Sequence, residues 1–364
     1  MKSLPRTLGR AASVTAAASL AAAAAAFLMN VVGVSHTVVF IVAAHALAGL
    51  ATLIGQATEQ LGHWYGPRTT GILQSALGNL PELFISIFAL QAGLVVVVQT
   101  ALIGSILANT LLVLGLAFLL GGLKHGTQPF HAPAVRDMAM LLVLAVAALA
   151  IPTLATAPGA PDAGHAVDLS VIVSIVLLVI FAASIPFSLS GGPGASAAVE
   201  HEAAERVWPL RLTIGILLLS AAGAALTSEL FVEALRPTMA SLQISEAFVG
   251  LVIVAIAGNA VEHVVGVQMA LRNKTDLATS LILNGSLQVA IALTPALVLI
   301  SLFVGGTPMT LVLSPLLLGA VALSAILAAL IVFDGESTWL EGLALLGLYV
   351  IIAASVWYGP PILP

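Results

Sequence analysis

Two glutamates stand in repeated surroundings that suit them to bind a cation or to carry a proton. Residues 78 to 90 read GNLPELFISIFAL and residues 258 to 271 read GNAVEHVVGVQMAL, so Gly-Asn-x-x-Glu occurs twice, ending at Glu82 and at Glu262. Both copies lie in long apolar runs, where a charged carboxylate costs roughly 3 kcal/mol or more unless it is protonated or paired with a cation. A carboxylate in such a place can exchange a proton for a metal ion.

The residues that flank each glutamate predict a local break and further oxygen ligands. Asn79 and Asn259 lie three residues before the two glutamates, on the same helical face. Gly78 and Gly258 allow another helix to approach closely, and Pro81 removes a backbone donor and so frees a carbonyl. Ligand oxygens are therefore expected to converge around a gap in each helix.

One further polar motif follows each glutamate. The sequence GSILAN contains Ser105 and ends at Asn109, and the sequence NGSLQ contains Ser286 and ends at Gln288. The two serines could complete a metal shell with their hydroxyl oxygens. The amides of Asn109, Gln288 and Gln99 could supply oxygens along an ion pathway, or could bond between helices, as polar residues commonly do in membranes.

A hard divalent cation fits this set of donors best. Ca²⁺ takes about 6 to 8 oxygen ligands at about 2.3–2.6 Å in flexible geometry, and two glutamates match its charge. Mn²⁺ is a further possible cargo. Softer transition metals more often bring cysteine or histidine ligands, but the chain has no cysteine and offers mainly His263 beside Glu262. That histidine could pack or hydrogen-bond, ligate the metal directly, or relay protons.

Composition predicts that the elements holding these residues are membrane helices. The chain has 364 residues, of which 60% are hydrophobic and 7% charged, and its mean hydropathy is +1.15. Such a chain cannot present the polar surface of a soluble globule, so we expect an all-α integral membrane protein in contact with the lipid bilayer. The net charge of −5 and the lack of a basic tract make nucleic acid an unlikely partner. Cofactor motifs are absent, and HEAAE at residues 201–205 lacks the second histidine of a zinc protease.

Counting apolar runs of about 20 residues between clusters of glycine, proline and charge predicts about eleven spans. Their expected limits are 11–30, 36–62, 70–93, 96–121, 136–156, 167–188, 209–235, 244–271, 278–304, 309–332 and 337–358. The first span is either a retained helix or a cleaved secretory signal, since three basic residues precede an alanine-rich run.

The basic residues predict the orientation, because Lys and Arg gather in short cytoplasmic loops. With a cytoplasmic N-terminus, ten of them fall inside and Arg236 falls outside, which also places the C-terminus outside. The ten are Lys2, Arg6, Arg10, Arg68, Lys124, Arg136, Arg206, Arg211, Arg272 and Lys274. A prokaryotic plasma membrane is the expected location.

The two glutamate motifs predict an inverted repeat. They are 180 residues apart, and the second lies five spans after the first, an odd number, so it enters the membrane from the opposite side. Such repeats point to a transport site near the midplane. The expected organisation is an extra helix (1–35), a first five-helix repeat (36–190), a cytoplasmic linker (191–208) and a second five-helix repeat (209–364). The linker's EHEAAER is either a solvated loop or a weak cation sensor.

Two further acidic residues have two interpretations each. Glu59, in GQATEQL, lies toward the cytoplasmic end of the second span, and Glu229, in TSELF, lies toward the external half of the seventh. Each could line an access path on its own side, or could be an interfacial side chain that reaches water.

The chain resembles the calcium/proton antiporters, or cation exchangers, of the calcium/cation antiporter superfamily. The resemblance rests on GQATEQL, GNLPELFISIFAL, VQTALIGSILANTLLVLG, GNAVEHVVGVQMALRNKTDLA, NGSLQVAIALTPALVL and FDGESTWLEG, which occur in the family's order. It implies that Glu82 and Glu262 bind the ion and carry protons, that flanking helices slide between two facing states, and that the plan has eleven helices with a dispensable first one. Leu80-Pro81 departs from the small or β-branched pair of many members, and the acidic linker is shorter than usual.

These features together predict a secondary transporter that exchanges Ca²⁺ for H⁺ by alternating access. The alternatives are a Na⁺/Ca²⁺ exchanger, for which the positions next to the glutamates lack extra Ser, Thr or Asp ligands, and a cation channel. We expect no enzyme activity, because no nucleophile and base or zinc triad can be assembled from these spans. The expected partners are inorganic cations, and no cofactor is expected.

Overall fold

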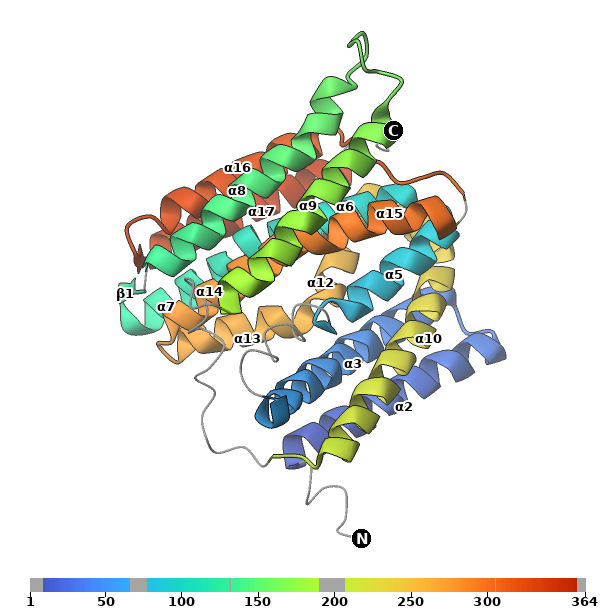
Figure 1. Ribbon diagram of the computed structural model, residues 1–364. Helices are drawn as coiled ribbons and strands as arrows, with labels where there is room; N and C mark the ends of the chain where they lie inside the picture. Colours follow the sequence, from blue (N-terminus) through green and yellow to red (C-terminus); the bar gives the residue numbers. More distant parts are fainter. Residues whose placement is uncertain (1–8, 66–76, 131, 190–206, 305, 359–364) are drawn as a thin grey trace. The chain divides into compact units, whose positions relative to one another are not determined.

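The computed structural model is built almost entirely from helices (Figure 1). It describes residues 9–65, 77–130, 132–189, 207–304 and 306–358. Within those ranges the strands are β1 (Gln128–Pro129) and β2 (Glu336–Ser337), which pair antiparallel. The predicted all-α class is therefore confirmed.

The helices follow the apolar runs of the sequence. They are α2 (Arg10–Val32), α3 (His36–Tyr65), α5 (Leu80–Gln91), α6 (Val95–Leu107), α7 (Leu114–His125), α8 (Ala132–Ala155), α9 (Ala166–Leu189), α10 (Leu210–Leu242), α11 (Glu246–Phe248), α12 (Ala255–Gly258), α13 (Ala260–Leu271), α14 (Thr275–Gln288), α15 (Thr294–Val304), α16 (Pro315–Ile331) and α17 (Trp339–Tyr358), together with the π-helices η1 (Ala108–Val113), η2 (Val249–Val254) and η3 (Val289–Leu293).

Length and composition identify the membrane spans. Among the described residues, eight helices are long and apolar enough to cross a membrane, and a bent pair that includes α13 makes a ninth if it counts as one span. The predicted third and tenth spans contain the shorter apolar helices α5 and α16. Helices of this length and composition identify an integral membrane protein. The number of eleven crossings stays a prediction.

Three predicted spans are interrupted. The chain turns at Gly78 and Asn79 before α5, and Pro81 lies in the first turn of α5, where a missing N–H breaks no helical bond. The eighth span turns at Asn259 and bends by 65° between residues 246–258 and 262–271. The tenth was expected to be helical from residue 309, but α16 begins only at Pro315.

Three π-helices interrupt otherwise continuous helices, and the sequence analysis did not predict them. Segment η1 joins α6 to α7, η2 joins α11 to α12, and η3 joins α14 to α15. A turn of π-helix contains more residues than a turn of α-helix, and such turns are frequent at functional sites. Here η1 contains Asn109, and η3 starts directly after Gln288, so two of the π-helices adjoin the polar motifs.

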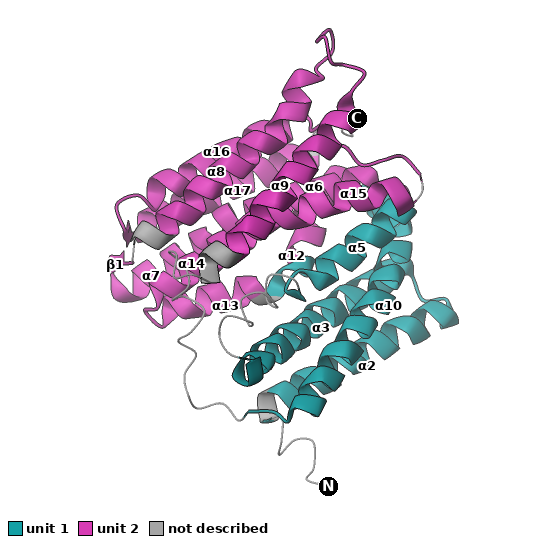
Figure 2. Ribbon diagram, in the orientation of Figure 1, with its two compact units in different colours: residues 1–92, 198–243, 257–261 teal, residues 93–197, 244–256, 262–364 magenta. Residues whose placement is uncertain are grey.

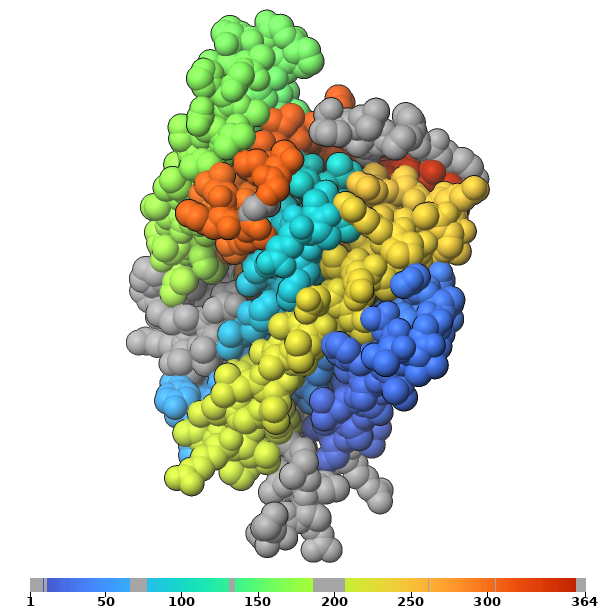
Figure 3. Space-filling view, turned by 90° about the vertical axis from the view of Figure 1, so that its right-hand side faces the viewer, coloured from blue at the N-terminus to red at the C-terminus, as the bar shows by residue number. Residues whose placement is uncertain are grey.

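The chain divides into two compact units, coloured in Figure 2. Unit 1 comprises Met1–Ala92, Ala198–Gln243 and Ala257–Val261. Within it α10 lies along α2 and α3 (Figures 1 and 3), and the rings of Phe40 and Phe231 stack 4.5 Å apart. The backbone of Trp208 is held by α3, because its N–H donates to Gln60 (2.8 Å) and its carbonyl accepts from Trp64 (3.0 Å). These bonds fix the start of α10 to the end of α3.

Unit 2 comprises Gly93–Ala197, Ile244–Ile256 and Glu262–Pro364, and its helices cross at glycines. A Cβ at Gly104 of α6 would overlap the backbone of Leu251 in η2, and a Cβ at Gly250 would overlap the Thr100 hydroxyl. The absence of side chains at both positions allows α6 and η2 to touch backbone to backbone.

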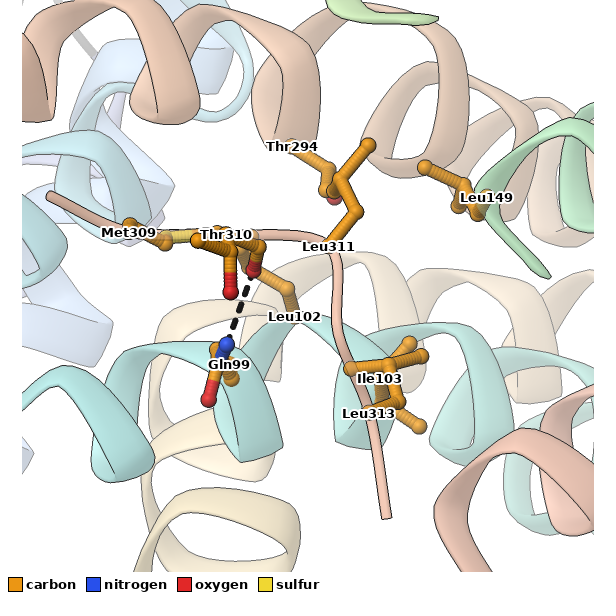
Figure 4. A pocket seen from close by; sticks show the side chains of 9 residues that line it. All are labelled: Gln99, Leu102, Ile103, Leu149, Thr294, Met309, Thr310, Leu311 and Leu313. Atoms are coloured by element: carbon orange, nitrogen blue, oxygen red, sulfur yellow. Dashed lines mark hydrogen bonds between the residues drawn. The ribbon is translucent and has the colours of Figure 1, made fainter. Parts of the chain in front are cut away.

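A non-helical segment of unit 2, residues 308–314, alternates half-buried and buried residues and is bound by side chains of four helices; we call it the strap. Side chains of those helices bind its backbone, as Gln99 of α6 shows in Figure 4 by donating to the Thr310 carbonyl at 2.8 Å. The other bonds are Met309 N–H to Ser301 (2.9 Å), Leu311 N–H to Ser170 (2.9 Å), Thr153 to the Leu311 carbonyl (3.0 Å) and Leu313 N–H to Thr153 (2.9 Å). Irregular backbone is tolerated inside a membrane bundle only when protein satisfies it in this way.

Candidate functional site

Glu82 lies in the first turn of α5, directly after the Gly-Asn turn. Its side chain is fully buried, at 0% exposure. The Asn79 carbonyl accepts the N–H of Leu83 at 2.9 Å, so Asn79 begins the helix. A carboxylate at this position faces the positive end of the helix dipole, which stabilises its charged form.

Gly258 brings the second motif against the first glutamate within unit 1. A Cβ at Gly258 would lie 3.5 Å from Cβ and 3.6 Å from Cγ of Glu82, which is ordinary van der Waals contact. Asn259, the next residue, is buried and occupies the turn between α12 and α13. The two Gly-Asn-x-x-Glu motifs therefore meet at this point although 180 residues separate them.

Glu262 has the corresponding place in the first turn of α13, in unit 2. Its side chain is half-buried, while its Oε2 atom is buried and has no hydrogen-bond partner among the described residues. That oxygen approaches Gly285 of α14, where a Cβ would lie only 2.7 Å from it. Gly285 thus leaves the space that the carboxylate occupies.

Asn109 reaches the same point from η1. Its Nδ2 atom would lie 3.1 Å from a Cβ at Gly285, and it too has no hydrogen-bond partner within the described part of the chain. Asn109 belongs to η1, and π-helical turns are frequent at functional sites. Glu262 and Asn109 therefore converge over a glycine with donor and acceptor atoms unsatisfied.

Two serines and a glutamine belong to the same two motifs as Asn109 and Gly285. Ser105 and Ser286 are fully buried, and Gln288 is buried. The Ser286 hydroxyl donates to the Ile282 carbonyl at 3.2 Å, which leaves the oxygen's lone pairs available to a cation. Carboxylate, amide and hydroxyl oxygens are the ligands that Ca²⁺ accepts.

The predicted pathway residues have different surroundings. Glu59 is half-buried and Glu229 is exposed, each on its own helix of unit 1. Gln99 binds the strap with its amide nitrogen. His263 has a buried Nε2 without a hydrogen-bond partner in the ranges that the structure covers. The acidic stretch EHEAAER at residues 200–206 lies outside the described residues.

A histidine- and acid-rich metal cluster is absent from the described residues, where no three His, Cys, Asp or Glu side chains gather. A cation here would instead be held by single carboxylates with amide and hydroxyl groups. Oxygen atoms of these kinds are the ligands that hard cations prefer.

Gly285 is the site residue that the sequence analysis missed. It belongs to the quoted NGSLQ motif and corresponds to Gly104 of GSILAN, but glycine carries no chemistry that would single it out. The recurrence of Gly-Ser in both motifs is the signal that could have identified it, since glycine marks close approach.

Comparison with known proteins gives matches over most of the chain. A family model described as sodium/calcium exchanger protein matches residues 35–190 and 212–358. The Ca²⁺/H⁺ antiporter of Synechocystis sp. is 35% identical over 353 residues, covering 92% of this chain and 94% of that protein. The Ca²⁺/H⁺ antiporter ChaA of Bacillus subtilis is 37% identical over 321 residues, covering 87% and 91%. The solved structure of native YfkE aligns with a TM-score of 0.81 at 32% identity, covering 94% of this chain and 99% of that one.

Proposed function

Because the chain belongs to the sodium/calcium exchanger protein family, we propose that it exchanges Ca²⁺ for H⁺ across a membrane, as the antiporters of Synechocystis and Bacillus subtilis are named to do. It is an integral membrane protein, and inorganic cations are its substrates. We also propose that it is a transporter without enzyme activity and without a cofactor.

One observation carries this proposal. Glu82 and Glu262 each occupy the first turn of a helix that restarts inside an apolar run after Gly-Asn. A carboxylate in an apolar run is stable in two ways, as the neutral acid or as the ligand of a cation. Protons and Ca²⁺ therefore compete for the same oxygens, and this competition couples their fluxes.

The proposed cycle follows from that competition. In one facing state the deprotonated glutamates bind Ca²⁺ with help from Asn79, Asn259, Ser105 and Ser286. Protonation from the other side releases the cation, and the protonated carrier returns. The charged empty site crosses poorly, because an unpaired charge in the membrane is costly, so uncoupled leak is suppressed.

The two stretches that match the family model support the predicted inverted repeats of residues 36–190 and 209–364. We place the N-terminus in the cytoplasm and the C-terminus outside a prokaryotic plasma membrane, on the strength of the ten-to-one distribution of basic residues. In that orientation an inward proton gradient would drive Ca²⁺ out of the cell.

The test uses purified protein in sodium-free liposomes with an imposed pH gradient. Ca²⁺ uptake and internal pH are followed together for the wild type and for Glu82→Gln and Glu262→Gln. We expect Ca²⁺ to move only against protons, and both variants to stop it. Ca²⁺ movement that needs sodium would identify a Na⁺/Ca²⁺ exchanger, and movement without a counter-ion would identify a channel.

Cation preference is tested in the same vesicles. Uptake of Mn²⁺ is measured under the same pH gradient and compared with uptake of Ca²⁺. We propose Ca²⁺ as the main cargo because its flexible oxygen shell matches the donors present. Transport of Mn²⁺ at the rate of Ca²⁺ would contradict that preference without affecting the proton coupling.

A further inference from the structure

The two helices that carry the glutamates are short and have the same length. Helix α5 (Leu80–Gln91) and helix α13 (Ala260–Leu271) have 12 residues each, and the glutamate is the third residue of each. We call α5 and α13 the glutamate helices. The last carbonyl groups of a helix have no partner within it and carry partial negative charge. Each glutamate helix therefore needs hydrogen-bond donors at the end opposite its glutamate.

The end of α5 is bound by a cation from α10, within unit 1. Ala92 follows the last residue of α5, and its carbonyl accepts a hydrogen bond from Arg236 at 2.7 Å. Helices α5 and α10 pack against each other. A positive charge at the C-terminal end of a helix is favourable, because it faces the negative end of the helix dipole. Arg236 thus fixes the end of α5 to α10.

The end of α13 is closed in part by its own backbone. Asn273 has a φ of 61°, in the left-handed region, and its N–H donates to the Ala270 carbonyl at 3.0 Å. The N–H of Lys274 donates to the Met269 carbonyl at 2.9 Å. These two bonds form a Schellman motif, which satisfies the carbonyls of Met269 and Ala270 and leaves that of Leu271 to donors from elsewhere.

Side chains at and just after the end of α7 supply those donors, within unit 2. Lys124 and His125 both donate to the Leu271 carbonyl, each at 2.9 Å. The Gln128 amide, which is buried, donates to the Ala270 carbonyl at 3.2 Å. Three side chains that lie close together in the sequence therefore bind the end of α13.

A bond of the same kind occurs at a helix without a glutamate. Arg136 donates to the carbonyl of Phe333, two residues beyond the end of α16, and its guanidinium lies 4.4 Å from the centre of the Phe333 ring. The glutamate helices differ from α16 in what lies at their other end. Glu82 and Glu262 are about 14–15 Å along the helix axis from the carbonyls of Ala92 and Leu271.

We propose that Arg236, and Lys124 together with His125, are positioning residues of the transport site. We call Arg236 the α5 clamp, and Lys124 with His125 the α13 clamp. A helix of 12 residues is stiff, so a shift at its bound end displaces the carboxylate at its other end. The clamps act on the cation only through these helices. The inference rests on the proposed function, since it names the residues that hold the two proposed ion-binding glutamates in place.

The test compares variants of the full-length protein in proteoliposomes. Arg236→Met removes the α5 clamp, and the double variant Lys124→Met/His125→Leu removes both donors from the Leu271 carbonyl. Arg136→Met is the matched control, because it removes the same kind of bond from a helix without a glutamate. Ca²⁺ uptake is measured over a range of Ca²⁺ concentrations with the counter-ion that the wild type uses, and thermal melting is followed in the same preparations.

We expect both clamp variants to raise the apparent KM for Ca²⁺ about two- to fivefold, with the maximal rate little changed. Loss of a favourable charge at a helix end lowers the population of the binding-competent arrangement by about this factor, and apparent affinity falls in proportion. The Arg136→Met control should lower the melting temperature as much as the clamp variants and keep the wild-type KM. Arg236→Lys, which retains a charge and a donor, should restore the wild-type KM.

Two results would overturn the proposal. A wild-type KM in a clamp variant overturns it for the helix concerned, and an equal rise of KM in Arg136→Met overturns it for both, since loss of stability alone would then explain the change. The side chains of Arg236, Lys124 and His125 are exposed, so the variants should fold. If the double variant does not, Lys124→Met alone replaces it.

This proposal and the proposed function fail separately. Wild-type transport that requires sodium overturns the proposed coupling ion, and a raised KM of the clamp variants in sodium still supports the clamps. Proton-coupled Ca²⁺ exchange by the wild type, with wild-type KM in both clamp variants, supports the proposed function and overturns the clamps.

Discussion

Replacing Gly285 with alanine tests the convergence of Glu262 and Asn109 more sharply than removing either side chain. The added methyl would lie 2.7 Å from Glu262 Oε2 and 3.1 Å from Asn109 Nδ2, whereas ordinary contact begins at 3.4 Å. Both groups must therefore retreat by several tenths of an ångström. The carboxylate, the amide and the helix are all retained, so the substitution changes only their geometry.

The cost to folding should be small. The atoms that must move are the ends of two side chains and not backbone, and alanine favours a helix over glycine by up to about 1 kcal/mol. We expect the free energy of unfolding to change by less than about 1 kcal/mol. Displacement of a reacting group by about 1 Å can cost roughly a hundredfold in activity, so we expect a ten- to hundredfold loss in apparent Ca²⁺ affinity, or about 1.4–2.7 kcal/mol.

The assay combines binding and stability. Ca²⁺ affinity is measured by calorimetry in detergent and by uptake into proteoliposomes, and thermal melting is followed in the same preparation. Gly319→Ala in α16 is the matched control, because a Cβ there meets no atom within 4 Å. The control should keep wild-type affinity and melt at the same temperature or slightly higher.

Two results would refute the reasoning. If Gly285→Ala binds Ca²⁺ as tightly as the wild type, the space over Gly285 is no part of the cation site. If Gly285→Ala unfolds while Gly319→Ala does not, the two side chains cannot move aside, and the glycine serves packing.

Three other predictions test separate parts of the structure. Gly104→Ala should destabilise the protein by more than about 2 kcal/mol in thermal melting, because the methyl would overlap the backbone of Leu251, and a near-wild-type melting temperature would argue against that crossing. Thr153→Val should speed hydrogen exchange of the strap amides while leaving α9 protected, since it removes two strap bonds; unchanged exchange would mean that the strap does not depend on them. Apparent Ca²⁺ affinity should fall as pH falls, because protons compete with Ca²⁺ for the glutamates, and a pH-independent affinity would contradict the shared site.

The sequence alone was sufficient to predict the membrane class, the helical segments and the family. The membrane class and the helices follow from composition and from apolar runs of about 20 residues. A single segment in lipid can hydrogen-bond all of its backbone groups only by forming a helix. The strap could not be predicted from its own residues, because the bonds that stabilise it come from other parts of the chain. Residues 308–314 continue an apolar part of the sequence, and most of the bonds that hold them outside a helix come from Gln99, Thr153 and Ser170, which are distant in sequence.

The candidate site was predictable as far as its charges. The repeat of Gly-Asn-x-x-Glu directed attention to Glu82 and Glu262, because acidic residues are conspicuous in an apolar sequence. The close approach of Glu262 and Asn109 to Gly285 could not be predicted, since it depends on which residues lie beside the glycine in the folded structure. The π-helix η1, which contains Asn109, has no sequence signature comparable to that of an α-helix.

The strap also determines how this region of the chain can change during evolution. Its backbone is held by side chains from four helices, so substitutions within residues 308–314 that preserve size leave every one of those bonds intact. The backbone path of the strap is determined instead by the four residues that bind it. Loss of one anchor leaves a buried carbonyl or amide unpaired, and a second change elsewhere must then compensate. Divergent relatives should therefore exchange strap side chains for others of similar size, while the four anchors change together or not at all.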